Sequence, residues 1–159
     1  MNDIAIALAL HVLAVVLWIG GVAMVTTVLM PAVERFKAPA ERVAFFEQVE
    51  RRFARQSRAT TLIAGGSGFY LLHRTGLEAL LWTLQGWWLG AMILVWLIFS
   101  LMLFVLEPLV LHRWLQERAA RDPERAFFLI RRLHWVLLAL SVVTVVGAAA
   151  GSHGLTFGP

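Results

Sequence analysis

The chain has 159 residues, of which 60% are apolar and only 15% are charged, and its mean hydropathy is +0.75. An ordinary soluble domain is about half apolar and about a quarter charged, and a chain this short cannot bury such an excess. The composition therefore argues against a soluble globular domain and excludes a disordered chain, while the length allows one domain, residues 1–159. On a soluble protein the net charge of +4 would indicate nucleic acid. The absence of cysteine excludes disulfides and thiolate metal sites.

Four apolar stretches predict the secondary structure. A helix needs about 20 apolar residues to cross the hydrocarbon core of a bilayer, and each stretch is interpreted as one crossing. The predicted transmembrane helices cover approximately residues 4–33, 57–75, 86–112 and 131–151. The predicted fold is therefore all-α, a four-helix transmembrane bundle whose N and C termini lie on the same side of the membrane.

The basic residues predict which side that is. Thirteen of the fourteen Lys and Arg residues lie between the first and second stretches or between the third and fourth, and Arg74 is the exception. The positive-inside rule places both basic connections in the cytoplasm. This predicts a multi-pass protein of a bacterial-type inner (plasma) membrane with both termini outside, in the periplasm. The charges are then explained by topology and by contact with the lipid bilayer, and no nucleic-acid partner is expected.

The cytoplasmic connections are predicted to be helical as well. Pro39 opens a stretch in which Phe45, Val49 and Phe53 recur every four residues with charges between them. Asp122 followed by Pro123 is typical of a helix N-cap and first turn.

Small residues within the apolar stretches predict where the helices touch, because they let neighbouring backbones approach closely. These residues are Gly20, Gly21, Gly65, Gly66, Ser67, Gly68, Gly147 and Gly151.

Three histidines are predicted to lie near the outer rim. Counted from the cytoplasmic boundary at about 1.5 Å per residue, His11, His73 and His153 lie roughly 30, 24 and 31 Å up three different helices. Neutral imidazole binds haem iron and copper, so the three are a candidate metal or cofactor site. Trp18 lies two turns after His11 on the same helix face and is a further candidate cofactor-binding residue.

His11 carries the strongest of these predictions. It lies in an otherwise apolar stretch, and ionisable residues at membrane depth tend to face the bundle interior and to have a function. The alternative is a histidine that is hydrogen-bonded to a neighbouring helix. For His73 and His153, which lie near water, an interfacial role is the stronger alternative.

A second candidate set lies toward the cytoplasm and comprises Glu107, His112 and His134. One interpretation is a second metal or haem site, or a proton path. The favoured interpretation is structural: Glu107 pairs with a basic residue such as Arg58 or Arg132, and the histidines are interfacial.

The methionines offer thioether sulfur as a soft ligand for copper. Their spacing along the helices favours packing instead. They are Met24, Met30, Met92 and Met102.

The first helix carries a histidine, a tryptophan seven residues later and then a pair of glycines. The run reads Leu10-His11-Val12-Leu13-Ala14-Val15-Val16-Leu17-Trp18-Ile19-Gly20-Gly21. It resembles two related groups of small membrane proteins, the HemJ-type protoporphyrinogen oxidases and the CopD-type copper-resistance membrane domains. The HemJ-type resemblance implies a four- or five-helix bundle that binds b-type haem through His11. The CopD-type resemblance implies copper import or handling.

The third stretch departs from the HemJ-type pattern. Where that pattern has Trp-Leu-His-x-Lys, this chain reads Trp88-Leu89-Gly90-Ala91-Met92. Gly90 and Met92 stand at the positions of the polar pair. The departure argues against porphyrinogen oxidation and leaves haem binding open.

Together these features predict a haem b-binding membrane protein for redox or electron transfer near the periplasmic face. His11 is the expected axial ligand, with His73 or His153 opposite, because two histidines leave no open position for oxygen chemistry. A quinone or a periplasmic redox protein is the expected partner, and a homodimer stays open. The alternatives are CopD-like copper import or handling and a non-catalytic accessory membrane subunit. No catalytic residue is predicted, and whether the protein is an enzyme, such as a membrane oxidoreductase, stays open.

Overall fold

The computed structural model describes residues 2–154, with the side chains of residues 110–112 left out, and the described part contains helices and no strand. The predicted all-α class is therefore confirmed. The α-helices are α1 (Asn2–Met24), α2 (Met30–Phe36), α3 (Pro39–Thr75), α4 (Trp87–Leu101), α5 (His112–Arg121) and α6 (Pro123–Ser152). Two π-helical segments, η1 (Val25–Leu29) and η4 (Met102–Leu111), join α1 to α2 and α4 to α5, and the 3-10 turns η2 (Leu77–Trp82) and η3 (Leu84–Gly86) join α3 to α4.

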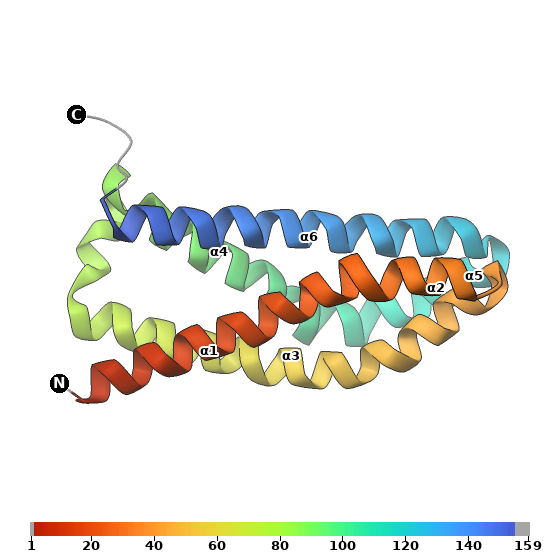
Figure 1. Ribbon diagram of the computed structural model, residues 1–159, viewed down its shortest axis with the longest axis horizontal. Coiled ribbons are helices and arrows are strands. Elements are labelled where there is room, and N and C mark those ends of the chain that lie inside the picture. Colours follow the sequence, from red (N-terminus) through yellow and green to blue (C-terminus); the bar gives the residue numbers. More distant parts are fainter. Residues whose placement is uncertain (1, 155–159) are drawn as a thin grey trace.

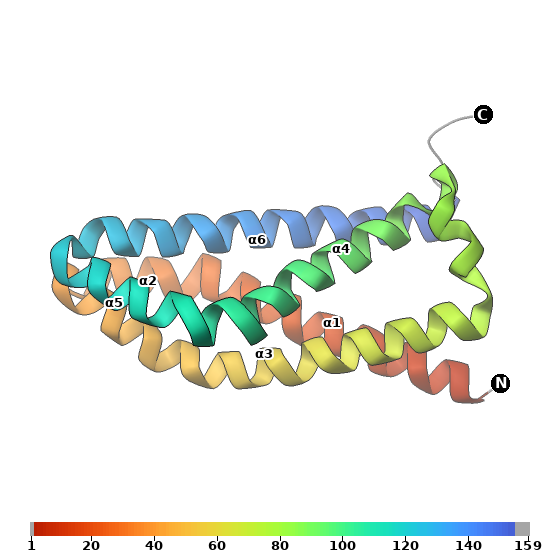
Figure 2. The same cartoon turned by 180° about the vertical axis from the view of Figure 1, so that it is seen from behind.

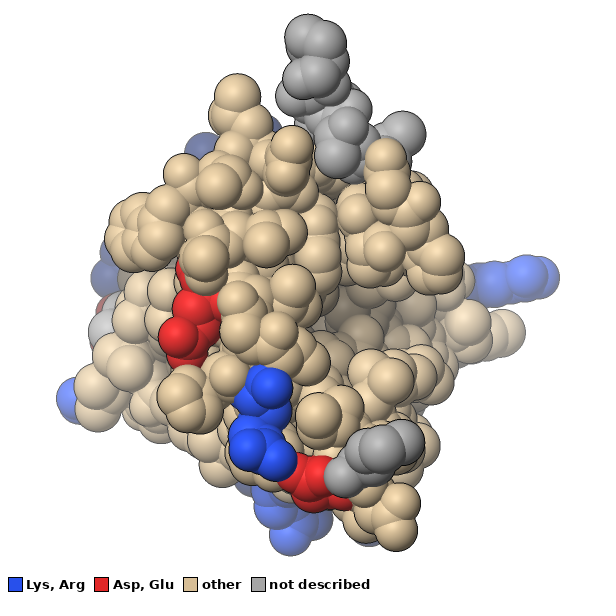
Figure 3. Space-filling model, turned by 90° about the vertical axis from the view of Figure 1, so that its left-hand side faces the viewer, with Lys and Arg blue, Asp and Glu red and all other residues tan. Residues whose placement is uncertain are grey.

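The helices run lengthwise beside one another (Figure 1). The start of α1 and the end of α6 lie at one end of the molecule, and the turns from α2 to α3 and from α5 to α6 lie at the other, as the view from behind also shows (Figure 2). Seen end-on, the end that carries the termini bears few charges and is hollowed at its centre (Figure 3). The two basic connections of the sequence therefore lie together at the opposite end.

Three helices are long and apolar enough to cross a membrane: Asn2–Phe36, Leu84–Leu109 and Pro123–Ser152. They contain the first, third and fourth predicted stretches, apart from the last residues of the third. The second predicted stretch, residues 57–75, is the second half of α3 and is not among them. Its glycines, hydroxyls and terminal Arg74 lower its hydropathy.

Hydroxyl side chains lie among the buried residues, while large aliphatic side chains face outward, unlike the pattern of a soluble protein. Six buried residues of the described chain carry hydroxyls, and many large aliphatic side chains on the outside are more than half exposed, such as Val16 and Val143 at 61% and 67%. Helices in lipid associate through small and hydroxyl side chains, while Val and Leu face acyl chains. This distribution supports a membrane protein. The buried hydroxyl residues are Thr26, Ser57, Thr60, Thr61, Ser141 and Thr144.

The predicted helix starts in the basic connections are confirmed. α3 begins at Pro39 and α6 begins at Pro123, where proline costs no intrahelical hydrogen bond. The Asp122 side chain accepts a hydrogen bond from the backbone N–H of Arg125 at 3.0 Å, as an N-cap residue does. Phe46 and Phe127 are buried together in a cluster beneath this end of the molecule.

The predicted glycine contacts are confirmed in part, and the group that approaches is an aromatic ring. A Cβ placed on Gly21 would lie 2.1 Å from the ring of Phe53, and one on Gly147 would lie 2.5 Å from the ring of Trp87. Gly20 and Gly66 face open space. The glycines on one face of each helix therefore make room for large side chains of the neighbouring helix.

Gly65 gives a test of this packing. A Cβ there would lie 2.6 Å from ring atoms of Trp96, whose indole N–H donates to the carbonyl oxygen of Thr61 at 2.9 Å. We expect Gly65→Ala to destabilise the protein by about 2 kcal/mol, because the ring has to move and its hydrogen bond is strained. Gly66→Ala is the matched control one residue away and is expected to be neutral or slightly stabilising. Thermal unfolding in detergent measures both, and equal melting temperatures would contradict this packing.

Candidate functional site

Two cavities lie between the helices, and Trp18 lines both. The first, which we name the His11 cavity, has a volume of about 460 Å³ and lies between α1, α3, α4 and α6. The second, which we name the Glu50 cavity, has a volume of about 690 Å³ and lies closer to the basic end. Both volumes fall in the range of small-molecule and cofactor sites.

The His11 cavity is almost wholly apolar, and His11 is its one ionisable lining residue. Gly65 and Gly68 of α3 and Ala148 of α6 line it beside the ring of Trp96. A Cβ on Gly68 would lie 3.0 Å from Cε1 of His11. The imidazole therefore lies against a surface from which side chains are absent.

The hydrogen bond of His11 fixes its tautomer. Nδ1 lies 2.9 Å from the carbonyl oxygen of Ala64 and 3.3 Å from Oγ of Ser67. Because a carbonyl oxygen only accepts, Nδ1 carries a proton, and the lone pair of the neutral form of the ring is therefore on Nε2. Histidines that bind metals have this arrangement, in which the second ring nitrogen donates to a carbonyl or carboxylate. The same bond also satisfies the alternative prediction of a histidine tied to a neighbouring helix.

The structure does not bring the three predicted outer histidines into one site. His73 is 78% exposed and its Nδ1 lies 2.9 Å from a carboxylate oxygen of Glu78. His153 follows the end of α6, where its Nδ1 lies 2.7 Å from the carbonyl oxygen of Ala149. Neither histidine lines the His11 cavity. Among the side chains that the structure describes, which exclude that of His112, no three of His, Cys, Asp or Glu are grouped to hold a metal ion.

Trp18 and Met92 complete the chemistry of the His11 cavity. Trp18 lines it together with His11, as the shared helix face predicts, and packs edge-to-face on Phe99 with ring centroids 4.8 Å apart. Met92 of α4 also lines this cavity, although its position in the sequence favoured packing. A thioether sulfur and an imidazole nitrogen thus share one apolar space. Met92 and His11 are far apart in the sequence, so their proximity becomes evident only from the packing of α4 against α1.

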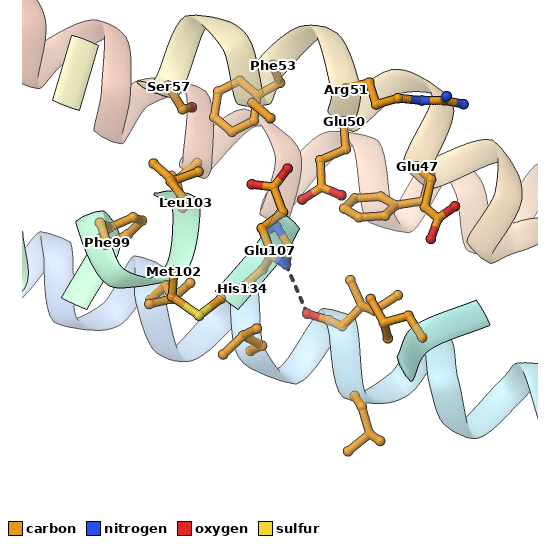
Figure 4. A pocket seen from close by; sticks show the side chains of 18 of the residues that line it. Glu47, Glu50, Arg51, Phe53, Ser57, Phe99, Met102, Leu103, Glu107 and His134 are labelled. Carbon is orange, nitrogen blue, oxygen red and sulfur yellow. Dashed lines mark hydrogen bonds between the residues drawn. The ribbon is translucent and has the colours of Figure 1, made fainter. Parts of the chain in front are cut away.

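The Glu50 cavity is lined by both apolar and charged side chains (Figure 4). Trp18, Phe99 and Leu137 supply apolar surface, and Glu50 and Glu107 supply carboxyl groups that point toward one another. No single stretch of sequence indicates this cavity, because its lining comes from α1, α3, α4, η4, α5 and α6.

The proline after Glu107 explains why Arg58 lies beside this carboxylate. In a π-helix the N–H of each residue bonds to the carbonyl five residues earlier, so Pro108, which has no N–H, leaves the carbonyl of Leu103 without its helical partner. Arg58 of α3 replaces that partner: its Nε donates to Leu103 O at 3.1 Å, and its Nη2 donates to Oε1 of Glu107 at 3.0 Å. The predicted structural pairing of Glu107 with Arg58 is therefore confirmed.

The other members of the inner candidate set do not join Glu107 in a metal site. His134 lines the Glu50 cavity, donates from Nδ1 to the carbonyl oxygen of Ile130 at 3.0 Å and lies edge-on to the ring of Phe46. The side chain of His112 lies outside the described residues. Within the described chain, no metal-binding group includes Glu107 or His134.

Glu50 has the altered acidity that a partly buried carboxyl group acquires. Burial, and after it the negative charges of Glu107 and Glu47, together raise the pKa of Glu50 from 4.5 to about 7, while the charge of Arg58 opposes the rise. Desolvation penalises the ionised form most. Glu50 therefore exchanges a proton near neutral pH.

The acidity of Glu50 predicts a pH-dependent stability. Its pKa is higher in the folded chain than in the unfolded chain, so its favourable contribution is complete below about pH 4.5 and is lost as the pH rises through about 7. Glu50→Gln is expected to raise stability by up to about 3 kcal/mol at pH 8 and to leave it unchanged at pH 4.5. The exposed Glu117→Gln is the control. Melting temperatures from pH 4.5 to 8 measure both, and parallel curves for Glu50→Gln and the unmodified protein would contradict the assignment.

Comparison with protein-family models, with curated proteins and with solved structures finds no match to this chain.

Proposed function

We propose that this is a multi-pass membrane protein that binds haem b in the His11 cavity and transfers electrons. The observation that carries the proposal is the state of His11. Its Nδ1 donates to Ala64 O at 2.9 Å, which leaves a lone pair on Nε2 of the neutral ring, and His11 lines an apolar cavity of about 460 Å³. A histidine held in this way is suited to be an axial ligand.

The proposed topology places the basic end in the cytoplasm and the termini outside, in a bacterial-type inner membrane. The second half of α3, residues 57–75, then crosses beside the three long apolar helices and completes a four-helix bundle. Its buried Thr60, Thr61 and Gly65 support this, because small and hydroxyl residues are typical of helix contacts in lipid. α3 has 37 residues, about 55 Å of helix against a hydrocarbon core of about 30 Å. Its first half, with Glu50, therefore lies at or beyond the cytoplasmic interface.

The residues of the His11 cavity fit a flat apolar group. Gly65, Gly68 and Ala148 leave room for a ring system, and Trp96 offers an aromatic face. When bound, haem supplies a reversible one-electron couple at its iron. Of the described lining residues, Met92 is the only one besides His11 with a soft nitrogen or sulfur donor, so it replaces His73 and His153 as the proposed opposite ligand.

Copper handling is a second candidate, favoured by the same pair of donors. Thioether sulfur and imidazole nitrogen both suit copper, and sulfur favours the reduced ion. In that case the cavity residues bind the ion without a porphyrin. The two functions differ in the element bound and in visible absorption.

The test is the absorption spectrum and metal content of protein purified in detergent from cells supplied with a haem precursor. The haem proposal predicts a Soret band and close to one iron per chain. Stoichiometric copper without a Soret band would establish the copper alternative. Protein that lacks both metals, even after incubation with haemin and with copper, would overturn both and favour a non-catalytic accessory subunit.

A further inference from the structure

Two buried donors on the wall of the Glu50 cavity have no acceptor. The side chains of Trp18 and Ser57 are 4% and 1% exposed, and neither the indole N–H nor the hydroxyl has a hydrogen-bond partner among the described residues. Both residues line this cavity. A buried donor without an acceptor costs about 1–3 kcal/mol. Such a pair on one cavity wall indicates a ligand that brings an acceptor.

The polar groups around the cavity restrict the charge of the ligand's head group. An indole N–H only donates, so the ligand group that it meets must carry a lone pair, which a cationic ammonium head lacks. The carboxyl groups of Glu50 and Glu107 are directed into the same space and repel an anionic head whenever they are ionised. A neutral carbonyl oxygen meets both conditions.

The shape of the cavity restricts the body of the ligand. Phe99, Met102 and Leu137 form apolar walls beside Trp18, and the charged residues Glu47 and Arg51 lie toward the basic end. In the proposed topology the apolar part lies at membrane depth and the charged part at the cytoplasmic interface. A ligand that enters from the bilayer therefore places an apolar ring between these walls and directs its polar groups to the donors.

We infer that the Glu50 cavity binds the head group of a membrane quinone, with a ring carbonyl accepting from Ser57 and Trp18. A quinone ring is flat, uncharged and apolar and carries carbonyl acceptors at its edge, as the cavity requires. Glu50 holds a proton near neutral pH and is thus a further donor to the ligand. This site is separate from the proposed haem site, and Trp18 is the wall that they share.

The experiment is binding of decylubiquinone to the haem-free protein in phosphatidylcholine nanodiscs, measured by calorimetry against empty nanodiscs. We expect saturable binding at one site per chain. Ser57→Ala is expected to weaken it about fivefold, the effect of one lost hydrogen bond. Ser100→Ala is the matched control, because its hydroxyl is also buried and without a partner but does not line the cavity. It is expected to bind as the unmodified protein does.

Trp18→Phe provides a second variant, which keeps an aromatic ring and removes the N–H. Decylbenzene, which has the same tail and no carbonyl, is the control ligand. Binding no stronger than to empty nanodiscs, equal affinities of Ser57→Ala and Ser100→Ala, or equal affinities for decylubiquinone and decylbenzene would each overturn the inference. Because the assay uses haem-free protein, its result is independent of whether the His11 cavity binds haem.

Discussion

Replacing His11 with alanine is expected to abolish the Soret band of protein purified with a supply of haem. The substitution removes the imidazole ligand that His11 offers, and Met92 alone is a weak ligand for haem iron. His73→Ala and His153→Ala are the matched controls, since both side chains lie outside the cavity. Each is expected to keep the band unchanged. The measurement is the absorbance ratio of the Soret band to 280 nm.

A folding defect is separated from a lost ligand by His11→Gly with added imidazole. Free imidazole occupies the space of the deleted ring and is expected to restore a Soret band when haemin is added. A band that persists in His11→Ala, or that disappears equally in His73→Ala, would show that His11 is not the ligand.

Replacing Arg58 with methionine is expected to destabilise the protein. The guanidinium donates to both the Leu103 carbonyl and the Glu107 carboxylate, so its loss leaves a helix carbonyl and a charge without partners. Breaking a fully buried pair costs about 3–5 kcal/mol. The Arg58 and Glu107 side chains are 34% and 28% exposed, and we therefore expect a loss of about 2 kcal/mol, or about 6 °C in melting temperature.

Two further variants separate the contributions of Arg58. Arg58→Lys keeps the charge but not the planar fork that reaches two acceptors, so its melting temperature is expected to lie between those of Arg58→Met and the unmodified protein. The double variant Arg58→Met, Glu107→Leu removes the uncompensated charge and is expected to recover part of the loss. A melting temperature of Arg58→Met within 1 °C of the unmodified protein, a margin of about 0.3 kcal/mol, would contradict this role.

Those features of the fold that depend on local chemistry could be predicted from the sequence. The proline at the start of α3, the Asp122 N-cap and the apolar length of three helices each follow from residues that are close together in the chain. The pairing of Glu107 with Arg58 could also be predicted from the sequence. A carboxylate near membrane depth requires a cation, and few cations are available at that height.

The candidate site could be predicted only in part, because residue counting gives height along a helix and not direction around it. His11, His73 and His153 are predicted to lie within about 7 Å of one another in height, yet of the three only His11 lines the cavity. The side chain of His73 instead contacts the carboxylate of Glu78. Met92 and Ser57 enter the account because helices distant in sequence are placed against one another.

The π-helical segments also lay beyond sequence reasoning. Pro108 predicts a disturbed helix, but a kink, a break and a π-turn are all consistent with a proline. Which of them forms depends on whether another helix can satisfy the freed carbonyl, and Arg58 of α3 does so here. The five-residue register then places Glu107 and Met102 on the wall of one cavity.

The most direct test of the central claim is the position of iron in crystals of the haemin-loaded protein, from anomalous scattering at the iron edge. The proposal predicts one iron peak in the His11 cavity, bonded to Nε2 of His11, while Nδ1 keeps its hydrogen bond to the Ala64 carbonyl. An iron peak beside His73 or His153, or no peak in a cavity that side chains or lipid fill, would contradict it.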